Sequence, residues 1–157
     1  MSIDGRHLRD ALGRFATGVC VITTSDEGAP VAMTVNSFAS VSLDPPLILW
    51  SLQNNSDQFH RVSAPRHSAV DVLAKEQQDL SNVYAKKGDH LLQNQHYRIG
   101  KYGSPVIRDA LTTLECEFEA SYDGGDHQII IGRVRDMHTR PTGTPLLFFS
   151  GAYRELH

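Results

Sequence analysis

The sequence of 157 residues has little of what marks the specialised protein classes. It contains two cysteines and one tryptophan, and its 15 basic and 18 acidic residues give a formal charge of −3. Two cysteines are too few for a disulfide scaffold, and the near balance of charge gives no electrostatic reason to expect nucleic acid as a partner. Hydrophobic residues make up 40% and charged residues 21%, which is ordinary for a globular domain and excludes a disordered or low-complexity chain.

Long hydrophobic runs are also absent. No run approaches the ~20 apolar residues that cross a bilayer, and the longest, Pro45 to Leu52, is typical of a buried strand. The opening residues MSIDGRHLRD contain no hydrophobic segment of the kind that signal peptides carry. We therefore expect a cytoplasmic protein without a membrane partner, and the length predicts one domain over residues 1–157.

The cysteines and histidines show no metal-binding spacing. Cys20 and Cys116 each stand among alternating apolar residues, which favours two reduced thiols in the core over a disulfide. The eight histidines form no HExxH or HxH pattern, and the sequence has no CxxC. His90 and His96 share an irregular segment without a ligand spacing, so we expect no metal site.

Three common catalytic or nucleotide-binding motifs are missing as well. The sequence has no GxGxxG, no GxxxxGK[ST] and no GxSxG. We therefore expect that a nucleotide cofactor, if one binds, is not held by a Rossmann-type loop.

Strand patterns outnumber helix patterns along the chain. A first helix is predicted from Asp4 to Gly18, because apolar residues between Leu8 and Ala16 recur at helical spacing. The other predicted elements are short helices at 57–64 and 77–85, a turn at 26–28, a long irregular loop at 86–104, and strands at 19–24, 31–35, 38–43, 47–52, 69–74, 114–122, 128–134 and 145–149.

The predicted strands follow one another in hairpin order and are not interleaved with long helices. This pattern favours a mainly β fold with short helices, an antiparallel barrel that is closed or partly closed, over a doubly wound parallel sheet. The clearest alternation runs from Leu114 to Tyr122, where apolar residues alternate with Glu115, Glu117 and Glu119. It predicts one buried face and one wet, acidic face.

Three polar segments are candidates for binding, and each also has an ordinary structural explanation. Hydroxyl and amide side chains between Thr34 and Ser42 could form either turn contacts or a neutral wall for a planar polar ligand. Asn54–Ser56 precedes a predicted helix and could either cap it or bind an anion. The turn that ends at His127 could be a plain hairpin, or could hold this histidine at a pocket rim with Asp126 biasing its protonation.

Several runs together resemble one known family. They are GRFATGV at 13–19, MTVNSFASVSLDPPL at 33–47, GDH at 125–127, IGRV at 131–134, PLLFF at 145–149 and GAY at 151–153. Over about residues 8–156 the chain resembles the short-chain flavin reductases, small NAD(P)H:flavin oxidoreductases that supply reduced flavin to two-component monooxygenases. The 33–47 run is the most specific part of this resemblance, and GDH is specific only in combination.

The resemblance implies an FMN-binding split barrel, a homodimer, and binding residues at defined positions. The flavin would lie along Thr34, Val35, Asn36 and Ser37, with Ser51 and Leu52 at the isoalloxazine edge and Asn55 and Ser56 near the phosphate. The stretch after the family's middle strand matches Leu73, Ala74 and Gln77. His127 matches a histidine near the nicotinamide, and no metal is implied.

The implied reaction is hydride transfer from NADH or NADPH to flavin N5. FMN is the implied flavin, with FAD or riboflavin as further substrates, and a flavin-dependent monooxygenase is the implied partner. Hydrogen-bond donors near flavin N1 and the C2 carbonyl would stabilise the reduced form, and no general base is needed. Two other functions stay open: an FMN-dependent oxidase or oxygenase acting on a small organic substrate, and a flavin-binding electron-transfer module without efficient NAD(P)H turnover.

Three features depart from the family pattern. Asp71 stands where many relatives have asparagine, and it would either repel the phosphate or face solvent. Trp50 is bulkier than the usual aliphatic residue and would meet either the ring or the core. The segment from His90 to Lys101 matches nothing firm. No basic cluster marks a pocket for a 2′-phosphate, which favours NADH over NADPH.

Overall fold

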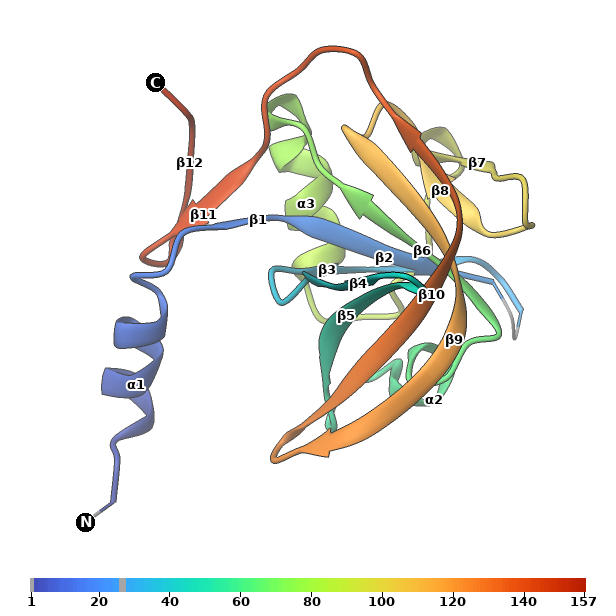
Figure 1. Cartoon of the computed structure of the whole chain (residues 1–157). Helices are drawn as coiled ribbons and strands as arrows, with labels where there is room; N and C mark the ends of the chain where they lie inside the picture. Colours follow the sequence, from blue (N-terminus) through green and yellow to red (C-terminus); the bar gives the residue numbers. More distant parts are fainter. Residues whose placement is uncertain (1, 26–27) are drawn as a thin grey trace.

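The computed structural model describes residues 2–25 and 28–157, and strands predominate in it (Figure 1). The helical elements are α1 Gly5–Leu12, α2 Phe59–Val62, η1 Lys75–Gln77, α3 Gln78–Ala85 and η2 Asn94–His96. The strands are β1 Thr17–Gly18, β2 Cys20–Thr24, β3 Val31–Val35, β4 Ala39–Leu43, β5 Pro46–Gln53, β6 His67–Val72, β7 Tyr97–Ile99, β8 Pro105–Ile107, β9 Thr112–Gly124, β10 His127–Thr139, β11 Leu147–Phe149 and β12 Ala152–Arg154. The prediction of a mainly β fold with short helices is confirmed.

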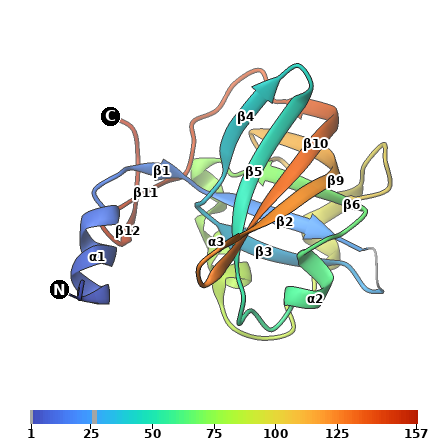
Figure 2. The same cartoon turned by 60° about the horizontal axis from the view of Figure 1, so that its bottom comes forward.

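Seven strands form one curved antiparallel sheet in the order β3-β2-β6-β9-β10-β5-β4 (Figures 1 and 2). The two edge strands, β3 and β4, follow one another in the chain and are joined by residues 36–38. The sheet is therefore a barrel that is split between β3 and β4, with a three-residue loop linking its two edges.

The hairpin predicted from residues 19–24 and 31–35 is present as β2 and β3, which pair from Cys20 opposite Val35 to Thr24 opposite Val31. Residues 26 and 27 of its expected turn lie outside the described residues.

Two apolar clusters lie on opposite faces of β2. One contains Ile22, Trp50, Cys20 and Cys116, and the other contains Tyr84 of α3. Trp50 is only 2% exposed, so its side chain belongs to the core. Both cysteines are free and buried, as predicted, and burial raises the pKa of each thiol to about 12.

α1 and a small sheet of β1, β11 and β12 form an arm beside the main sheet (Figures 1 and 2). Asp4 is the N-cap of α1, as predicted, and its carboxylate accepts two backbone N–H bonds from the first turn. The helix stops at Gly13 and not at Gly18, because the Gly13 carbonyl accepts a hydrogen bond from Ser150 N–H at 2.8 Å and the chain turns into the small sheet. The apolar face that the spacing predicted is exposed in the single chain, where Phe15 is 78% exposed.

The alternation predicted for β9 holds only in part. Cys116 is buried, but Glu115 on the opposite face is also buried, at 4% exposed. The segment before β8 covers Glu115, and the Tyr102 backbone N–H donates to its carboxylate at 3.0 Å. Tyr122 is 60% exposed, because the β9–β10 hairpin extends beyond the body of the sheet at this end (Figure 1). The prediction of one buried and one wet face is therefore wrong at these two positions.

Asp71 points into the core, so neither expectation for its side chain holds. The carboxylate accepts hydrogen bonds from the Ile107 backbone N–H and the Thr113 hydroxyl, each at 3.0 Å, and lies 3.0 Å from the Thr23 hydroxyl. Burial raises the pKa of Asp71 to about 7, because the loss of hydration outweighs these contacts and the nearby carboxylate of Glu115 adds repulsion.

Residues 86–104 contain η2 and β7, although they were predicted to be irregular throughout. β7 pairs with β8, and the Tyr84 hydroxyl holds the segment through Gln93 N–H at 2.9 Å and His96 Nδ1 at 2.7 Å. In the part of the chain that the structure describes, no helix has the length and apolar character needed to span a membrane.

Candidate active site

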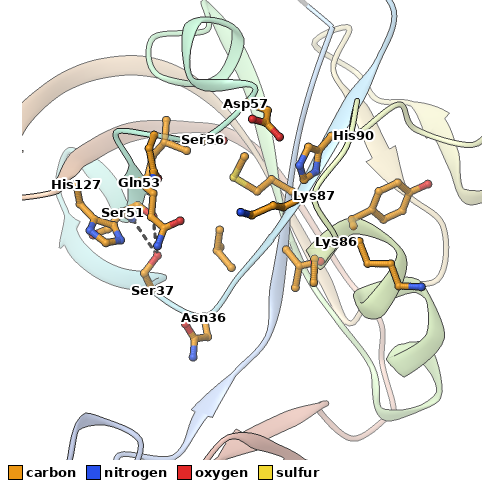
Figure 3. A pocket seen from close by; sticks show the side chains of 17 residues that line it. Asn36, Ser37, Ser51, Gln53, Ser56, Asp57, Lys86, Lys87, His90 and His127 are labelled. Atoms are coloured by element: carbon orange, nitrogen blue, oxygen red, sulfur yellow. Dashed lines mark hydrogen bonds between the residues drawn. The ribbon is translucent and has the colours of Figure 1, made fainter. Parts of the chain in front are cut away.

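A cavity of about 370 Å³ lies beside the loop that links β3 to β4 (Figure 3). Its size is typical of sites that bind small molecules. The lining residues are Met33, Thr34, Val35, Asn36, Ser37, Ser51, Leu52, Gln53, Asn55, Ser56, Asp57, Tyr84, Ala85, Lys86, Lys87, His90 and His127. Nine of the twelve predicted site residues therefore meet here: Thr34, Val35, Asn36, Ser37, Ser51, Leu52, Asn55, Ser56 and His127.

The neutral wall of the cavity comes from β3, the loop after it, and β5. The Ser37 hydroxyl accepts a hydrogen bond from Ser51 N–H at 2.9 Å and donates to the Ser51 carbonyl at 3.2 Å (Figure 3). The Thr34 hydroxyl donates to the Ser81 carbonyl of α3 at 2.7 Å. These two hydroxyl protons are thus committed to contacts within the chain. The amides of Asn36 and Gln53 and the hydroxyl of Ser51 are the polar side chains of this wall that remain for a ligand.

The loop after β5 carries Asn55, Ser56 and Asp57. The Ser56 hydroxyl oxygen accepts a hydrogen bond from the Gln58 backbone N–H at 3.3 Å, so its proton is free to donate elsewhere. α2 begins only at Phe59 and has four residues, which is too short for a useful helix dipole. A helix dipole therefore gives no support for an anion in this loop, and Asp57 adds a negative charge to it. Anion binding at Asn55 and Ser56 rests on their own polar groups and stays a prediction.

His127 begins β10 and stands opposite Gln53 of β5. Its Nδ1 atom lies 2.6 Å from the Asp126 carboxylate, and this contact lowers the pKa of Asp126. Gly125 turns the hairpin with a φ of 70°, and Asn54 N–H donates to the Asp126 carbonyl at 2.9 Å. The ring is thus held at the cavity rim, and Nε2 is left as the nitrogen that can meet a ligand.

The opposite wall contains Lys86, Lys87 and His90, which the sequence reasoning did not include among the site residues (Figure 3). The signal that could have found them is the pair of lysines followed by glycine directly after a predicted helix. His90 is fixed to the edge strand, because its carbonyl accepts Ala32 N–H at 2.9 Å and its Nδ1 lies 3.2 Å from the Ala32 carbonyl.

Leu73, Ala74 and Gln77 lie outside this cavity. Leu73 and Ala74 are completely buried. Gln77 accepts a hydrogen bond from Ala74 N–H at 2.9 Å and donates to the Arg108 carbonyl at 2.8 Å. The contacts of these residues in the described structure hold η1 against the sheet.

Comparison with known proteins identifies the family. The family model described as flavin reductase like domain matches residues 12–157. The chain belongs to the flavin reductase family. This family member is 43% identical over 150 residues to the FMN reductase (NADH) SmoA of Agrobacterium fabrum, over 96% of this chain and 85% of that protein. The resemblance drawn from the sequence is confirmed.

Further relatives and solved structures agree with this assignment. The reductase component of the flavin-dependent trigonelline monooxygenase of Acinetobacter baylyi is 40% identical over 94% of this chain, which spans only 48% of that relative's length. The flavin reductase PheA2 superposes with a TM-score of 0.89 at 39% identity, over 99% of each chain. The NADH:FAD oxidoreductase SgcE6 of Streptomyces globisporus, solved with NAD and FAD fragments, gives a TM-score of 0.92 at 33% identity, over 100% of this chain and 97% of that one. The split-barrel fold is therefore confirmed.

Proposed function

We propose that the chain catalyses NAD(P)H-dependent reduction of a flavin and supplies the reduced flavin to a partner monooxygenase. The observation that carries this proposal is the single cavity that collects His127 and eight of the predicted flavin-contacting residues, in a member of the flavin reductase family. The names of two relatives support it, since SmoA is an FMN reductase using NADH and the Acinetobacter relative is the reductase component of a monooxygenase.

The residues that line the cavity fit a flavin. Apolar side chains such as Met33 and Val35 suit the faces of the ring system, and the neutral polar groups of Asn36 and Ser51 suit its edge. When bound, the flavin supplies the acceptor for a hydride from the nicotinamide. The residues of the chain then have two tasks: to hold both rings in contact and to keep the polar edge of the flavin hydrogen-bonded.

We propose His127 as the residue that contacts the nicotinamide donor. Asp126 engages Nδ1 at 2.6 Å, which leaves Nε2 to meet the donor at the cavity rim. His127 would orient the nicotinamide, so its loss slows the reaction without abolishing it.

We propose FMN as the flavin and NADH as the donor, with FAD as the alternative flavin and NADPH as the alternative donor. The printed names of the relatives support both flavins, since SmoA is an FMN reductase and SgcE6 an FAD oxidoreductase, and NADH is the donor in both names.

We also propose that residues 1–157 act as one domain and that the chain forms a homodimer. The arm exposes Leu12 at 65% and Phe15 at 78%, and β4 exposes Leu43 at 96%. Exposed apolar surface on a projecting helix and on an edge strand suits coverage by a second copy. Sedimentation velocity tests the dimer, because a species of one chain's mass at micromolar concentration contradicts it.

An absorbance time course at 340 nm tests the reductase activity. The purified chain is mixed in air with NADH and FMN, with NADPH and FAD in parallel. Loss of NADH over many turnovers that depends on added flavin is the expected result and also gives the cofactor preference. A bound-flavin spectrum without NADH loss would point instead to an electron-transfer module or to an FMN enzyme with another substrate.

A further inference from the structure

The Lys87 ammonium reaches into the cavity from the wall opposite β5. Figure 3 shows it directed across the cavity toward Gln53, which directly precedes the loop that carries Asn55 and Ser56, whereas the Lys86 side chain is directed away from the centre. The two neighbours therefore carry the same charge in the same loop but present it to different surroundings.

Lys87 has no ion-pair partner among the described residues. The ion pairs in the described residues join histidines or arginines to acidic residues, and none involves a lysine. Asp57 is the acidic residue that lines the same cavity, and it forms no ion pair with Lys87. A cation without a counterion in a concave polar site is suited to an anionic group of the ligand.

The loop that carries Lys87 is anchored at both ends. At its start, α3 is tied to β3 by the Thr34 hydroxyl, which donates to the Ser81 carbonyl at 2.7 Å. At its end, the His90 carbonyl accepts Ala32 N–H at 2.9 Å. Residues 86–89 therefore span a short, fixed gap beside β3, which limits how far the base of the Lys87 side chain can move away from the cavity.

The flavin ring system is neutral, and the 5′-phosphate is the charged group that distinguishes FMN from riboflavin. The wall that carries Asn36 and Ser51 is neutral, so it does not distinguish FMN from riboflavin by charge. α2 is too short to attract an anion, and Asp57 repels one from its own side of the loop. The Ser56 hydroxyl can donate one neutral hydrogen bond to a phosphate, and Lys87 is the cation directed into the cavity that can attract its charge.

On the basis of the function proposed above, we propose that Lys87 is the specificity-determining residue that selects phosphorylated flavins over riboflavin by binding the phosphate. Lysines after a helix C-terminus also interact favourably with the helix dipole, which is a purely structural reason for a cation at this place. Lys86 shares that structural role but not the orientation into the cavity, so it provides a matched control.

The test is the equilibrium binding of FMN and of riboflavin, measured by quenching of flavin fluorescence, with no donor present. For Lys87→Gln we expect the Kd for FMN to rise about 5- to 30-fold, the size of one charge-assisted hydrogen bond, and the Kd for riboflavin to change less than about 2-fold. Lys87→Arg should restore most of the preference for FMN. Lys86→Gln should change the Kd for FMN no more than about 2-fold.

The outcomes separate this inference from the function on which it rests. If wild-type chain binds FMN and riboflavin equally, or if Lys87→Gln and Lys86→Gln weaken FMN equally, the role of Lys87 is overturned while the flavin site stands. If wild-type chain binds neither flavin, the proposed function fails and this inference fails with it. A preference for FMN that decreases with added salt in the wild type, and that is lost in Lys87→Gln, supports the proposal.

Discussion

The hydroxyl of Ser37 accepts a hydrogen bond from the backbone N–H of Ser51 and donates one to the carbonyl of the same residue. Ser37 follows one edge strand of the main sheet, and Ser51 lies in the strand next to the other edge. This pair therefore ties together the two sides of the split, at the wall of the candidate active site.

Replacement of Ser37 by alanine should loosen that tie. Ser37→Ala removes two hydrogen bonds and leaves the Ser51 N–H and carbonyl half-buried without them, so we expect the free energy of unfolding to fall by about 1–2 kcal/mol. Flavin affinity should fall as well, because the neutral wall loses its fixed position. Urea denaturation and flavin titration measure the two effects. Ser40→Ala, on the exposed face of β4, is the control and should change neither.

Asp71 should make the stability of the chain depend on pH. Its pKa is raised to about 7 in the folded state, whereas an aspartate in the unfolded chain titrates near 4. Between these values the folded state keeps a proton that the unfolded state releases, so the contribution is full below about pH 4 and is lost as the pH rises to about 7. Denaturation curves should show stability falling by ~2–4 kcal/mol over this range.

Asp71→Asn should abolish that slope. Thr23 Oγ1 lies 2.6 Å from the Pro105 carbonyl and 3.0 Å from the Asp71 carboxylate, and its one proton serves only one of them. An asparagine amide can donate to Thr23 while its oxygen keeps the bonds from Ile107 and Thr113. The variant should therefore be more stable than wild type at pH 8 and similar at pH 4.5. Asp10→Asn, on the exposed α1, should keep the wild-type slope, and an unchanged slope in Asp71→Asn would contradict the assignment.

His127 should affect the donor more than the flavin. His127→Ala is expected to lower kcat/KM for NADH about 10-fold, the cost of one hydrogen bond of about 1.4 kcal/mol, with flavin affinity changed less than about 2-fold. Asp126→Asn removes the contact at Nδ1 and should give a smaller loss in the same parameter. Steady-state kinetics with varied NADH measure both. His138→Ala, exposed further along β10, is the control, and equal kinetics for all three variants would remove His127 from the site.

The two thiols should be unreactive in the folded protein. Cys20 and Cys116 are buried, and burial raises the pKa of each thiol to about 12. At pH 8 a reagent therefore cannot reach the sulfur atoms, and both thiols stay protonated. A colorimetric disulfide reagent should titrate no thiol under native conditions and two thiols in denaturant. Fast labelling of either cysteine in the native state would show that the core opens locally.

The sequence was most informative where a residue's environment follows from its near neighbours. The β2–β3 hairpin and β5 were predictable because their side chains alternate or stay apolar over five residues or more. The cap at Asp4 was predictable for the same local reason. Most of the candidate site followed from the family resemblance, since its residues cluster in the 33–56 stretch and at His127.

What escaped prediction depends on contacts between distant segments. Glu115 is buried because the segment around Tyr102 folds over it, and no alternation within β9 reveals that cover. α1 ends early because Ser150, far along the chain, meets Gly13. Lys87 lines the cavity because the hydrogen bond between His90 and Ala32 holds its loop against β3. No sequence pattern in residues 86–104 predicts that hydrogen bond.

The split between β3 and β4 has a thermodynamic consequence. In a closed barrel, backbone hydrogen bonds would join β3 to β4, whereas here the two strands do not pair and the candidate ligand cavity lies beside them. At a free flavin concentration 100 times the Kd, flavin binding would raise the free energy of unfolding by ~2.7 kcal/mol. We expect much of this stabilisation at the two edge strands β3 and β4. Amide hydrogens of both edge strands should then exchange more slowly with solvent when flavin is bound. The substrate itself would thus stabilise the side of the barrel that no strand pairing closes.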